Sequence, residues 1–153
     1  MPIVKGRALD NNVYVTQTDT TIGFISQSAD RLDEIKGRSP SKHYIRALPS
    51  LGRLKAFTRV PQSHKNRVRR ARRSTFIFPD GHSYRVVAEG CHHRLIERLG
   101  WAYTTSANRS GEAYHSEFAE SVADIIVGFP AGERGDEASR IYRVGNATIK
   151  RIR

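Results

Sequence analysis

The sequence contains a single cysteine, Cys91, among its 153 residues, so no disulfide can form within the chain. It has no apolar run of the length that crosses a bilayer. The first segment, Met1 to Asn12, lacks the apolar core of a secretory signal. These absences argue against a disulfide-stabilised secreted protein and against a membrane-spanning one. We expect a soluble globular protein of the reducing cytoplasm, organised as one domain over residues 1–153.

Negative charge is missing from a long internal segment. No Asp or Glu occurs between Ile35 and Pro79, yet this segment holds 13 of the 26 Lys and Arg residues. The formal net charge of the whole chain is +11 at pH 7. Such an imbalance attracts polyanions, so nucleotide phosphates, tRNA or other nucleic acid are the expected partners. A solvated basic face with no dedicated partner is the alternative that charge alone leaves open.

Strand and helix patterns alternate along the chain. Alternating β-branched and aromatic residues, or short apolar runs, predict strands over residues 11–18, 74–79, 83–88, 101–108, 124–129, 140–144 and 147–153, and the strand over 101–108 is expected to run out into a loop. The strand over 124–129 is expected to be buried, and Asp80-Gly81 predicts a hairpin turn. Apolar spacing with capping residues predicts helices over 28–35, 92–99 and 116–122, of which Gly37 and Gly100 end the first two and Ser116 caps the third. This order predicts a mixed α/β sheet with helices on its faces.

The segment after the first helix is a candidate phosphate site. Phosphate recognition needs fixed cations together with hydroxyl or backbone donors. Lys36 and Arg38 would project together if the segment is extended, and Lys42 adds a cation after a Ser-Pro-Ser turn. The alternative is an ordinary helix C-terminus with basic residues, which the helix dipole favours.

A second candidate site lies near residue 106. Ser106 and Asn108 would also project together from an extended segment, and a hydroxyl with an amide suits a carboxylate, a carbamate or a ribose. The alternative is a polar turn in which these side chains bond to their own backbone.

Taken in this order, Lys-x-Arg and a distant Ser-x-Asn resemble the tetrad of the YrdC-like family, which includes threonylcarbamoyl-AMP synthases. Thr104 to Glu112 is close to that family's Ser-Thr-Ser-Ala-Asn-Leu-Ser-Gly-Glu segment, and Thr18 to Gly23 is similar to its Pro-Thr-Asp/Glu-Thr-Val-Tyr-Gly segment. Glu34 to Arg38, Ser74 to Ile77 and Tyr84 to Val86 match further family segments. The resemblance extends from about Val13 to the C-terminus.

The resemblance implies a YrdC-like fold, a single-domain twisted mixed sheet with helices on its faces and a concave basic cleft. It also implies an enzyme that condenses threonine, bicarbonate and ATP into L-threonylcarbamoyladenylate, with release of pyrophosphate and Mg²⁺ on the phosphates. A transfer complex would then use the product to form threonylcarbamoyladenosine (t6A) in tRNA.

The resemblance assigns roles to particular positions. The catalytic tetrad would be Lys36, Arg38, Ser106 and Asn108. Threonine and its carbamate would be bound by Thr20, Arg85, Thr104 and Ser139. The nucleotide would be bound by the tetrad together with Lys42 and Arg153.

Some positions depart from the family pattern, among them Gln17 and Ser39 in place of prolines and Ile22 in place of a tyrosine.

The chain also carries an arginine run before the strand at residue 74, at positions Arg67, Arg69, Arg70, Arg72 and Arg73. This run predicts contact with RNA or tRNA, and a solvated mobile loop is its alternative. The alternative function is therefore an RNA-binding (double-stranded RNA or tRNA) or regulatory module of the same fold without turnover.

Neighbouring histidines follow the cysteine at His92 and His93. Adjacent residues at a helix start point in different directions, so we expect no metal site there. Trp101 is expected to be a core residue rather than a platform for a base.

Overall fold

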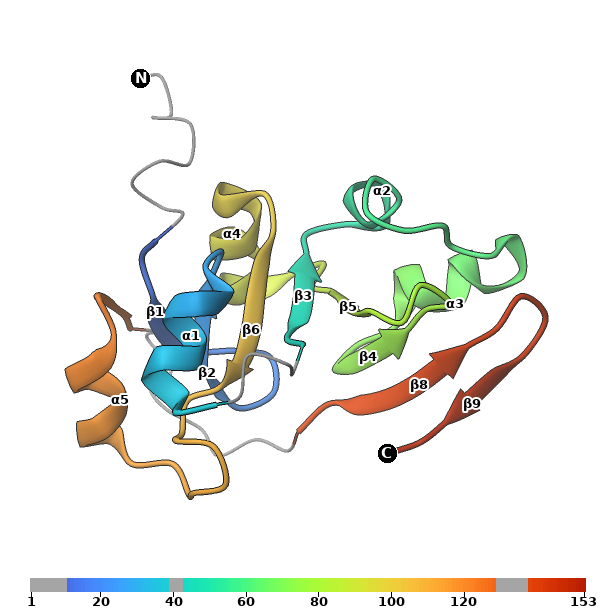
Figure 1. The fold of residues 1–153 in the computed structure, drawn as a ribbon. Coiled ribbons are helices and arrows are strands. Elements are labelled where there is room, and N and C mark those ends of the chain that lie inside the picture. Colours follow the sequence, from blue (N-terminus) through green and yellow to red (C-terminus); the bar gives the residue numbers. More distant parts are fainter. Residues whose placement is uncertain (1–10, 39–42, 129–137) are drawn as a thin grey trace.

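The computed structural model describes residues 11–38, 43–128 and 138–153. Within these ranges the strands form a nine-stranded sheet in the order β7-β1-β2-β6-β3-β5-β4-β8-β9 (Figure 1). The strands are β1 (Tyr14–Gln17), β2 (Ile22–Ser26), β3 (Ile45–Leu48), β4 (Ser74–Ile77), β5 (Ser83–Val86), β6 (Ala102–Ser106), β7 (Ile125–Val127), β8 (Arg140–Val144) and β9 (Ile149–Arg151). The helices are α1 (Ala29–Lys36), α2 (Leu51–Leu54), α3 (Lys65–Arg70), α4 (Gly90–Leu99) and α5 (Ser116–Val122), with a 3₁₀ turn, η1 (Gln62–His64), before α3.

The sheet is mixed, as the sequence predicted. Strands β1–β2, β2–β6, β3–β6, β4–β5 and β8–β9 pair antiparallel, whereas β1–β7, β3–β5 and β4–β8 pair parallel. The expected α/β class with helices on the faces of the sheet is therefore confirmed. None of the helices within the described residues has the length and apolar character needed to cross a bilayer.

Successive strand residues point to opposite faces of the sheet. Because strands such as β2 carry apolar residues at successive positions, both faces of the sheet are apolar and helices cover both. On one face, Val15 and Phe24 pack with Leu32 of α1 and Ala119 of α5. On the other face, residues such as Ile25 and Ala102 pack with Ile96 of α4. A third core lies under α2 and α3 and joins these short helices to β3, β4 and β5, through Leu48, Leu54, Val68, Phe76 and Tyr84.

Helix α1 begins and ends where the sequence signals stand. The hydroxyl of Ser28 accepts a hydrogen bond from the backbone N–H of Arg31, at 3.2 Å. Gly37 follows the helix with a φ of 62°, a left-handed conformation that glycine adopts without steric cost. Lys36 is the last helical residue. The extended segment that would align Lys36 with Arg38 was therefore a wrong prediction.

Two further expectations about the C-terminal half were wrong. Ser116 is the first residue of α5 and not its cap, since His115 occupies the capping position and makes no side-chain cap bond. Strand β7 is not buried: Ile125 is 37% exposed and Ile126 57% exposed. This strand forms an edge of the described sheet, where only β1 pairs with it, so its apolar run is not covered on both sides.

Candidate functional site

A cavity of about 240 Å³ lies beside the turn between β1 and β2 and the ends of β5 and β6. Its lining is rich in hydroxyls and cations. The hydroxyls come from Thr18, Thr20, Thr21, Thr104, Thr105, Ser106 and Ser139, and the guanidinium groups from Arg38, Arg85 and Arg153. His43, Tyr44, Ile45 and Ala138 complete the described lining, which contains no Asp or Glu. The cavity is therefore suited to an anionic ligand with several polar groups.

The turn between β1 and β2 presents its threonines in a fixed arrangement. The hydroxyl of Thr18 lies 3.2 Å from that of Thr20 and donates to the carbonyl of Thr21 at 2.5 Å. The side-chain amide of Gln17 donates to the carbonyls of Thr18 and Thr20 at 3.1 and 3.3 Å. Gly23 lets this turn approach β6 closely, because a Cβ atom there would lie 2.9 Å from the carbonyl oxygen of Thr105.

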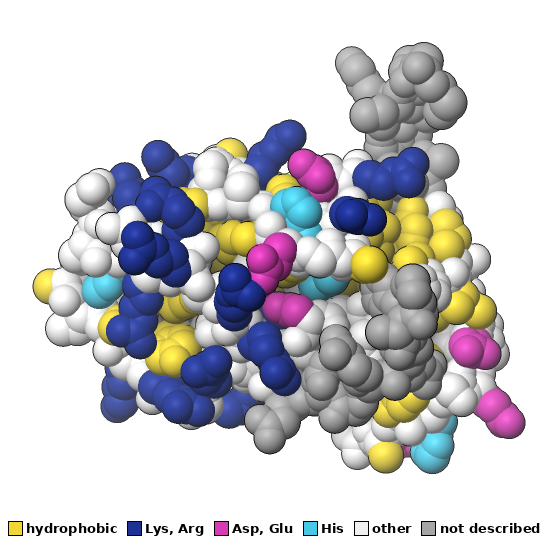
Figure 2. Space-filling model, turned by 180° about the vertical axis from the view of Figure 1, so that it is seen from behind, with side chains coloured by type: hydrophobic (Ala, Val, Ile, Leu, Met, Phe, Trp, Pro, Cys, Tyr) yellow, Lys and Arg dark blue, Asp and Glu magenta, His cyan; other side chains and the backbone are white. Residues whose placement is uncertain are grey.

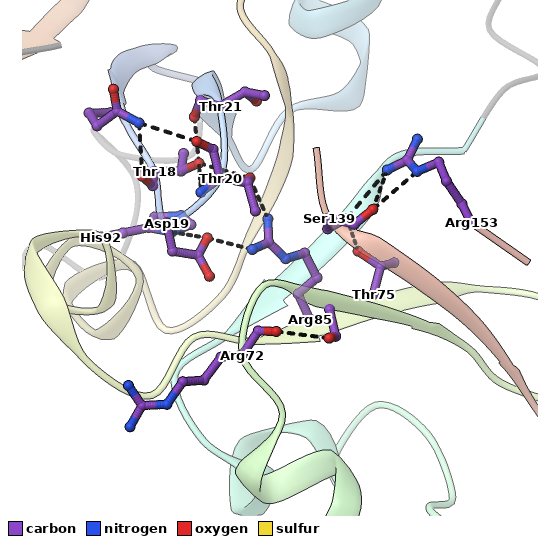
Figure 3. Close-up of polar contacts among 12 residues, drawn as sticks. Thr18, Asp19, Thr20, Thr21, Arg72, Thr75, Arg85, His92, Ser139 and Arg153 are labelled. Atoms are coloured by element: carbon purple, nitrogen blue, oxygen red, sulfur yellow. Dashed lines mark hydrogen bonds and ion pairs between the residues drawn. The ribbon is translucent and has the colours of Figure 1, made fainter. Parts of the chain in front are cut away.

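Arg85 reaches the cavity from β5 and is almost fully buried. Its guanidinium forms an ion pair with Asp19 and donates to the hydroxyl of Thr20 at 3.3 Å, as Figure 3 shows. The ring Nδ1 of His92, from α4, lies 3.5 Å from the same carboxylate. Burial alone would raise the pKa of Asp19, but His92 and Arg85 together lower it to about 2. Burial lowers the pKa of His92, which favours the neutral ring.

The opposite wall of the cavity is built around Ser139, directly before β8. Arg153 donates from Nε and Nη2 to the Ser139 carbonyl, at 3.0 and 2.8 Å. The hydroxyl of Ser139 lies 2.8 Å from that of Thr75 on β4. Figure 3 shows Arg153 and Arg85 reaching toward Ser139 and Thr20 from different elements. The C-terminal strand pair thus places one cation of the cavity.

The two halves of the expected tetrad meet, although about 70 positions of chain separate them. The ammonium of Lys36 donates to the carbonyl of Ser106 at 2.7 Å and to that of Asn108 at 2.8 Å. The backbone N–H of Ser110 donates in turn to the Lys36 carbonyl at 3.0 Å. Burial and the charge of Arg38 lower the pKa of Lys36 to about 8. Lys36 therefore fixes the loop that follows β6.

Asn108 does not project beside Ser106, because the chain turns after β6. The N–H of Asn108 donates to the carbonyl of Ser106 at 2.9 Å, and its side-chain amide donates to the carbonyls of Arg109 and Glu112 at 2.8 and 2.7 Å. The expectation that both side chains point together was wrong, since it assumed extended backbone. Ser106 lines the cavity and the Asn108 side chain stabilises the loop beside it.

The remaining cations separate into two groups. Arg38 lines the cavity, where it lies 4.4 Å from the ring centre of Tyr44 and donates to the His43 carbonyl at 3.1 Å. Lys42 lies outside the described residues. The arginine run does not reach the cavity: Arg67, Arg69 and Arg70 belong to α3, and Arg72 and Arg73 follow it. In Figure 3 the Arg72 side chain points away from Thr20 and Arg85.

Sequence reasoning missed several residues around the cavity. Asp19 was not selected, although it stands directly before the selected Thr20 and is an acid that Arg85 could pair with. His92 was considered only as a metal ligand, whereas it lies buried behind Asp19. Within the described ranges no group of three or more His, Cys, Asp or Glu side chains could hold a metal ion. His43 and Tyr44 carried no signal, because only the folded chain brings them to the cavity.

No protein-family model matches the sequence. The chain is 35% identical over 101 residues to an uncharacterized protein of Mycoplasma pneumoniae, the MG259 homolog, and this match covers 63% of the chain and 20% of that protein. A match to MG259 of Mycoplasma genitalium is 28% identical over 107 residues and covers 69% and 23% of the two chains. The chain thus spans less than a quarter of the length of these curated relatives.

Solved structures are similar over almost the whole chain. P. abyssi Sua5 complexed with L-threonine superposes with a TM-score of 0.79 at 18% identity, over 99% of this chain and 52% of Sua5. E. coli YciO gives a TM-score of 0.71 at 17% identity, over 93% and 82% of the two chains. The fold is that of Sua5 and YciO. HypF in a phosphate- and nucleotide-bound form contains a similar region, with a TM-score of 0.75 at 14% identity over 100% of this chain and 29% of HypF.

Proposed function

We propose that this chain is an L-threonylcarbamoyladenylate synthase-like member of the YrdC family, acting in t6A formation from threonine, bicarbonate and ATP. The observation that carries the proposal is the cavity, where three guanidinium groups and seven Ser and Thr hydroxyls meet without an acidic side chain in the described lining. Substrates with a carboxylate, a carbamate and a triphosphate require this excess of donors and positive charge. The Sua5 structure with L-threonine and the phosphate- and nucleotide-bound HypF structure support it, since both share the fold.

The proposed subsites follow the walls of the cavity. Threonine and its carbamate would lie against the hydroxyls and guanidinium of Thr20, Arg85, Thr104 and Ser139. The nucleotide would lie along the opposite side, with Arg38, Ser106 and Arg153, while Lys36 and Asn108 hold the adjoining loop in position. Lys42 is proposed as a further phosphate contact.

The chemistry needs positioning rather than a covalent nucleophile. The threonine amine reacts with bicarbonate to give a carbamate and water. A carbamate oxygen then attacks the α-phosphorus of ATP, the bond to the β-phosphate breaks, and pyrophosphate leaves. Clustered guanidinium groups offset the repulsion between these anions and stabilise the charge that develops on the phosphates. Mg²⁺ would be held by phosphate oxygens, because the described lining offers it no Asp or Glu side chain.

The direct test supplies ATP, threonine and bicarbonate to the purified chain and follows the release of pyrophosphate. Omission of threonine or bicarbonate should abolish the release. Lys36→Met keeps the length of the side chain but removes the charge that fixes the loop after β6. We expect it to lower the rate by about 100-fold. Lys55→Ala, an exposed lysine after α2, is the matched control and should leave the rate unchanged. A wild-type chain that folds and releases no pyrophosphate would overturn the proposal.

The pH dependence of nucleotide binding gives a second test. Lys36 has a pKa near 8 in the folded chain, so its charge is present below that pH and is lost as the pH rises through it. If the charge holds the loop and attracts phosphates, the affinity for ATP should fall above pH 8 in a calorimetric titration. Lys36→Arg keeps its charge at every pH used, so in that variant the fall should disappear.

The second candidate function is an RNA-binding or regulatory module without turnover. The observation that favours it is the uneven charge: Lys and Arg side chains crowd the half of the molecule that contains α3, β8 and β9 (Figure 2). Under this reading labelled RNA binds with a steep salt dependence while no pyrophosphate is released.

A further inference from the structure

A second cavity lies apart from the first, between α3 and the strands β4 and β8. It has a volume of about 440 Å³ and is lined by Asn66, Arg67, Arg70, Ala71, Arg72, Ser74, Phe76, Arg140 and Tyr142. We call these residues the arginine pocket. It contains Arg67, Arg70 and Arg72 of the arginine run, which the proposed synthase reaction does not use.

The arginine pocket and the first cavity lie on opposite faces of the sheet. Thr75 on β4 and Ser139 before β8 share a hydrogen bond at the first cavity. Phe76 and Tyr142 stand opposite each other in the register of β4 and β8 and line the arginine pocket. Because neighbouring residues in a strand point to opposite faces, the same two strands serve both cavities. A ligand in one cavity therefore leaves the other accessible.

Aromatic rings form the floor of the arginine pocket. The rings of Phe76 and Tyr142 are stacked, with centroids 5.5 Å apart and an angle of 21° between their planes. The guanidinium of Arg67 lies over the Tyr142 ring at 5.0 Å from its centre. Phe76 is buried, whereas Tyr142 is only partly covered. A guanidinium plane over an aromatic ring is a surface on which a nucleobase can stack.

The rim of the arginine pocket carries uncompensated positive charge. Arg67, Arg70 and Arg140 are exposed, and none of them forms an ion pair with an acid of the described residues. Only Arg72 is paired, with Glu89. Arg151 stands opposite Tyr142 in the pairing of β8 with β9, so the basic surface continues beyond the pocket. Figure 2 shows Lys and Arg side chains crowded over this half of the molecule, around apolar patches.

We infer that the arginine pocket binds one nucleotide of a single-stranded RNA segment. The base stacks on the Arg67–Tyr142 floor, and the flanking phosphates contact Arg70 and Arg140. A single strand fits better than a duplex, because in a duplex the faces of the bases are covered by their neighbours. The cations beyond the pocket, Arg151 among them, favour a nucleic-acid chain over a free nucleotide, because a chain has further phosphates that can contact them. This inference is independent of the proposed synthase activity.

The test measures fluorescence anisotropy of a short labelled single-stranded RNA with the purified chain at several salt concentrations. Arg70→Ala and Arg140→Ala should each weaken binding by about tenfold at low salt and reduce the salt slope by about 0.7. Arg98→Ala removes the same charge from an exposed position on α4 and is the matched control. An equal loss in Arg98→Ala would show that net charge alone drives binding and would overturn the inference.

The aromatic floor is tested by a second ligand that has phosphates but no bases. Tyr142→Leu should weaken the binding of RNA by about tenfold, while the binding of inorganic polyphosphate stays unchanged. Tyr142→Phe keeps the ring and should bind RNA as the wild type does. If Tyr142→Leu is too unstable to use, Arg67→Lys, at an exposed position, keeps the charge but removes the guanidinium plane and should show the same separation of the two ligands.

Two competitors test whether the bound nucleotide belongs to a single strand, to a duplex or to a free nucleotide. A duplex of the same sequence and free AMP should each displace the labelled strand only at concentrations at least about tenfold higher than the unlabelled strand requires. Displacement by the duplex or by AMP at the concentration of the single strand would overturn the assignment to single-stranded RNA. Pyrophosphate release should be unaffected by Arg70→Ala, so failure of this inference and failure of the synthase proposal give different results.

Discussion

Arg85 of the first cavity and the arginines of the arginine pocket differ in how their charges are held. In the cavity beside β5, Arg85 has a side chain that is 5% exposed and forms an ion pair with Asp19. In the arginine pocket, Arg70 and Arg140 are exposed and have no acidic partner among the described residues. The first arrangement fixes a charge within the fold, and the second leaves charge available to a partner.

The two kinds of arginine affect different properties, the stability of the fold and the attraction of polyanions to the surface. A buried charge without its partner is costly, so Arg85 and Asp19 depend on each other for folding. Exposed arginines contribute little to folding and repel one another slightly, but they raise the local concentration of polyanions. Substitutions should therefore divide into those that unfold the chain and those that only change binding.

The largest expected effect is that of Arg85→Met. It leaves the partly buried Asp19 without its counter-charge, so we expect the free energy of unfolding to fall by about 3 kcal/mol. Urea denaturation measures the change. Removal of both charges, in Arg85→Met with Asp19→Leu, should restore part of the loss. If the double variant loses as much free energy of unfolding as the two single variants together, the broken ion pair is not the cause of the loss.

Acid should break the same pair without mutation. Asp19 has a pKa of about 2 in the folded chain against an ordinary value of 3.8, so its contribution is present above 3.8 and is lost as the pH falls through about 2. The contribution is about 2 kcal/mol. His92, whose pKa is lowered by burial, adds a loss of stability in the same direction below its ordinary value of 6.5. The midpoint of urea unfolding, measured across this pH range, should depend less on pH in Asp19→Asn than in the wild type. In Glu120→Gln, an exposed control on α5, its pH dependence should be that of the wild type.

Two glycine substitutions test how tightly the chain is packed beside the first cavity and in α2. Gly23→Ala would place a Cβ 2.9 Å from the Thr105 carbonyl, at the turn that borders the first cavity. We expect a loss of about 1 to 2 kcal/mol in the free energy of unfolding. Gly52→Ala, in α2, would place a Cβ 3.7 Å from the hydroxyl of Ser50, which is an ordinary contact. It should raise stability by about 0.5 kcal/mol, and thermal unfolding of the two variants distinguishes the cases.

The smallest effect is expected in the arginine pocket itself. Arg70→Ala should change the free energy of unfolding by no more than about 0.5 kcal/mol, with the largest change at low salt, where charges repel most strongly. Parallel urea titrations at low and high salt measure it. A loss of more than about 1 kcal/mol would show that this arginine is structural.

Local signals carried much of the fold. Helix α1 follows from Ser28 and Gly37, and the β4–β5 hairpin follows from Asp80-Gly81, because capping and turn geometry depend on neighbouring residues. The short strand β3 and helix α2 were not predicted. Each has only four residues, too few to display a period, and long-range packing holds them in place.

The candidate site was predicted by residue but not by geometry. Thr20, Arg85, Thr104, Ser106 and Ser139 were selected, and all of them line the first cavity. The expected extended segments at Lys36 and Asn108 were wrong, because one residue ends a helix and the other lies in a turn. Backbone conformation at an element boundary depends on where the chain must go next, which a local pattern does not contain.

The sequence by itself determined the balance of charge, the positions of the caps and turns, and the polar residues available to a site. Only the tertiary structure decided which of the arginines are buried and which are exposed. It also brought the ammonium of Lys36 to the loop after Ser106. Strand order and register determine which arginines are buried and which distant residues meet. They bring together residues far apart in the chain and direct neighbouring side chains to opposite faces of the sheet.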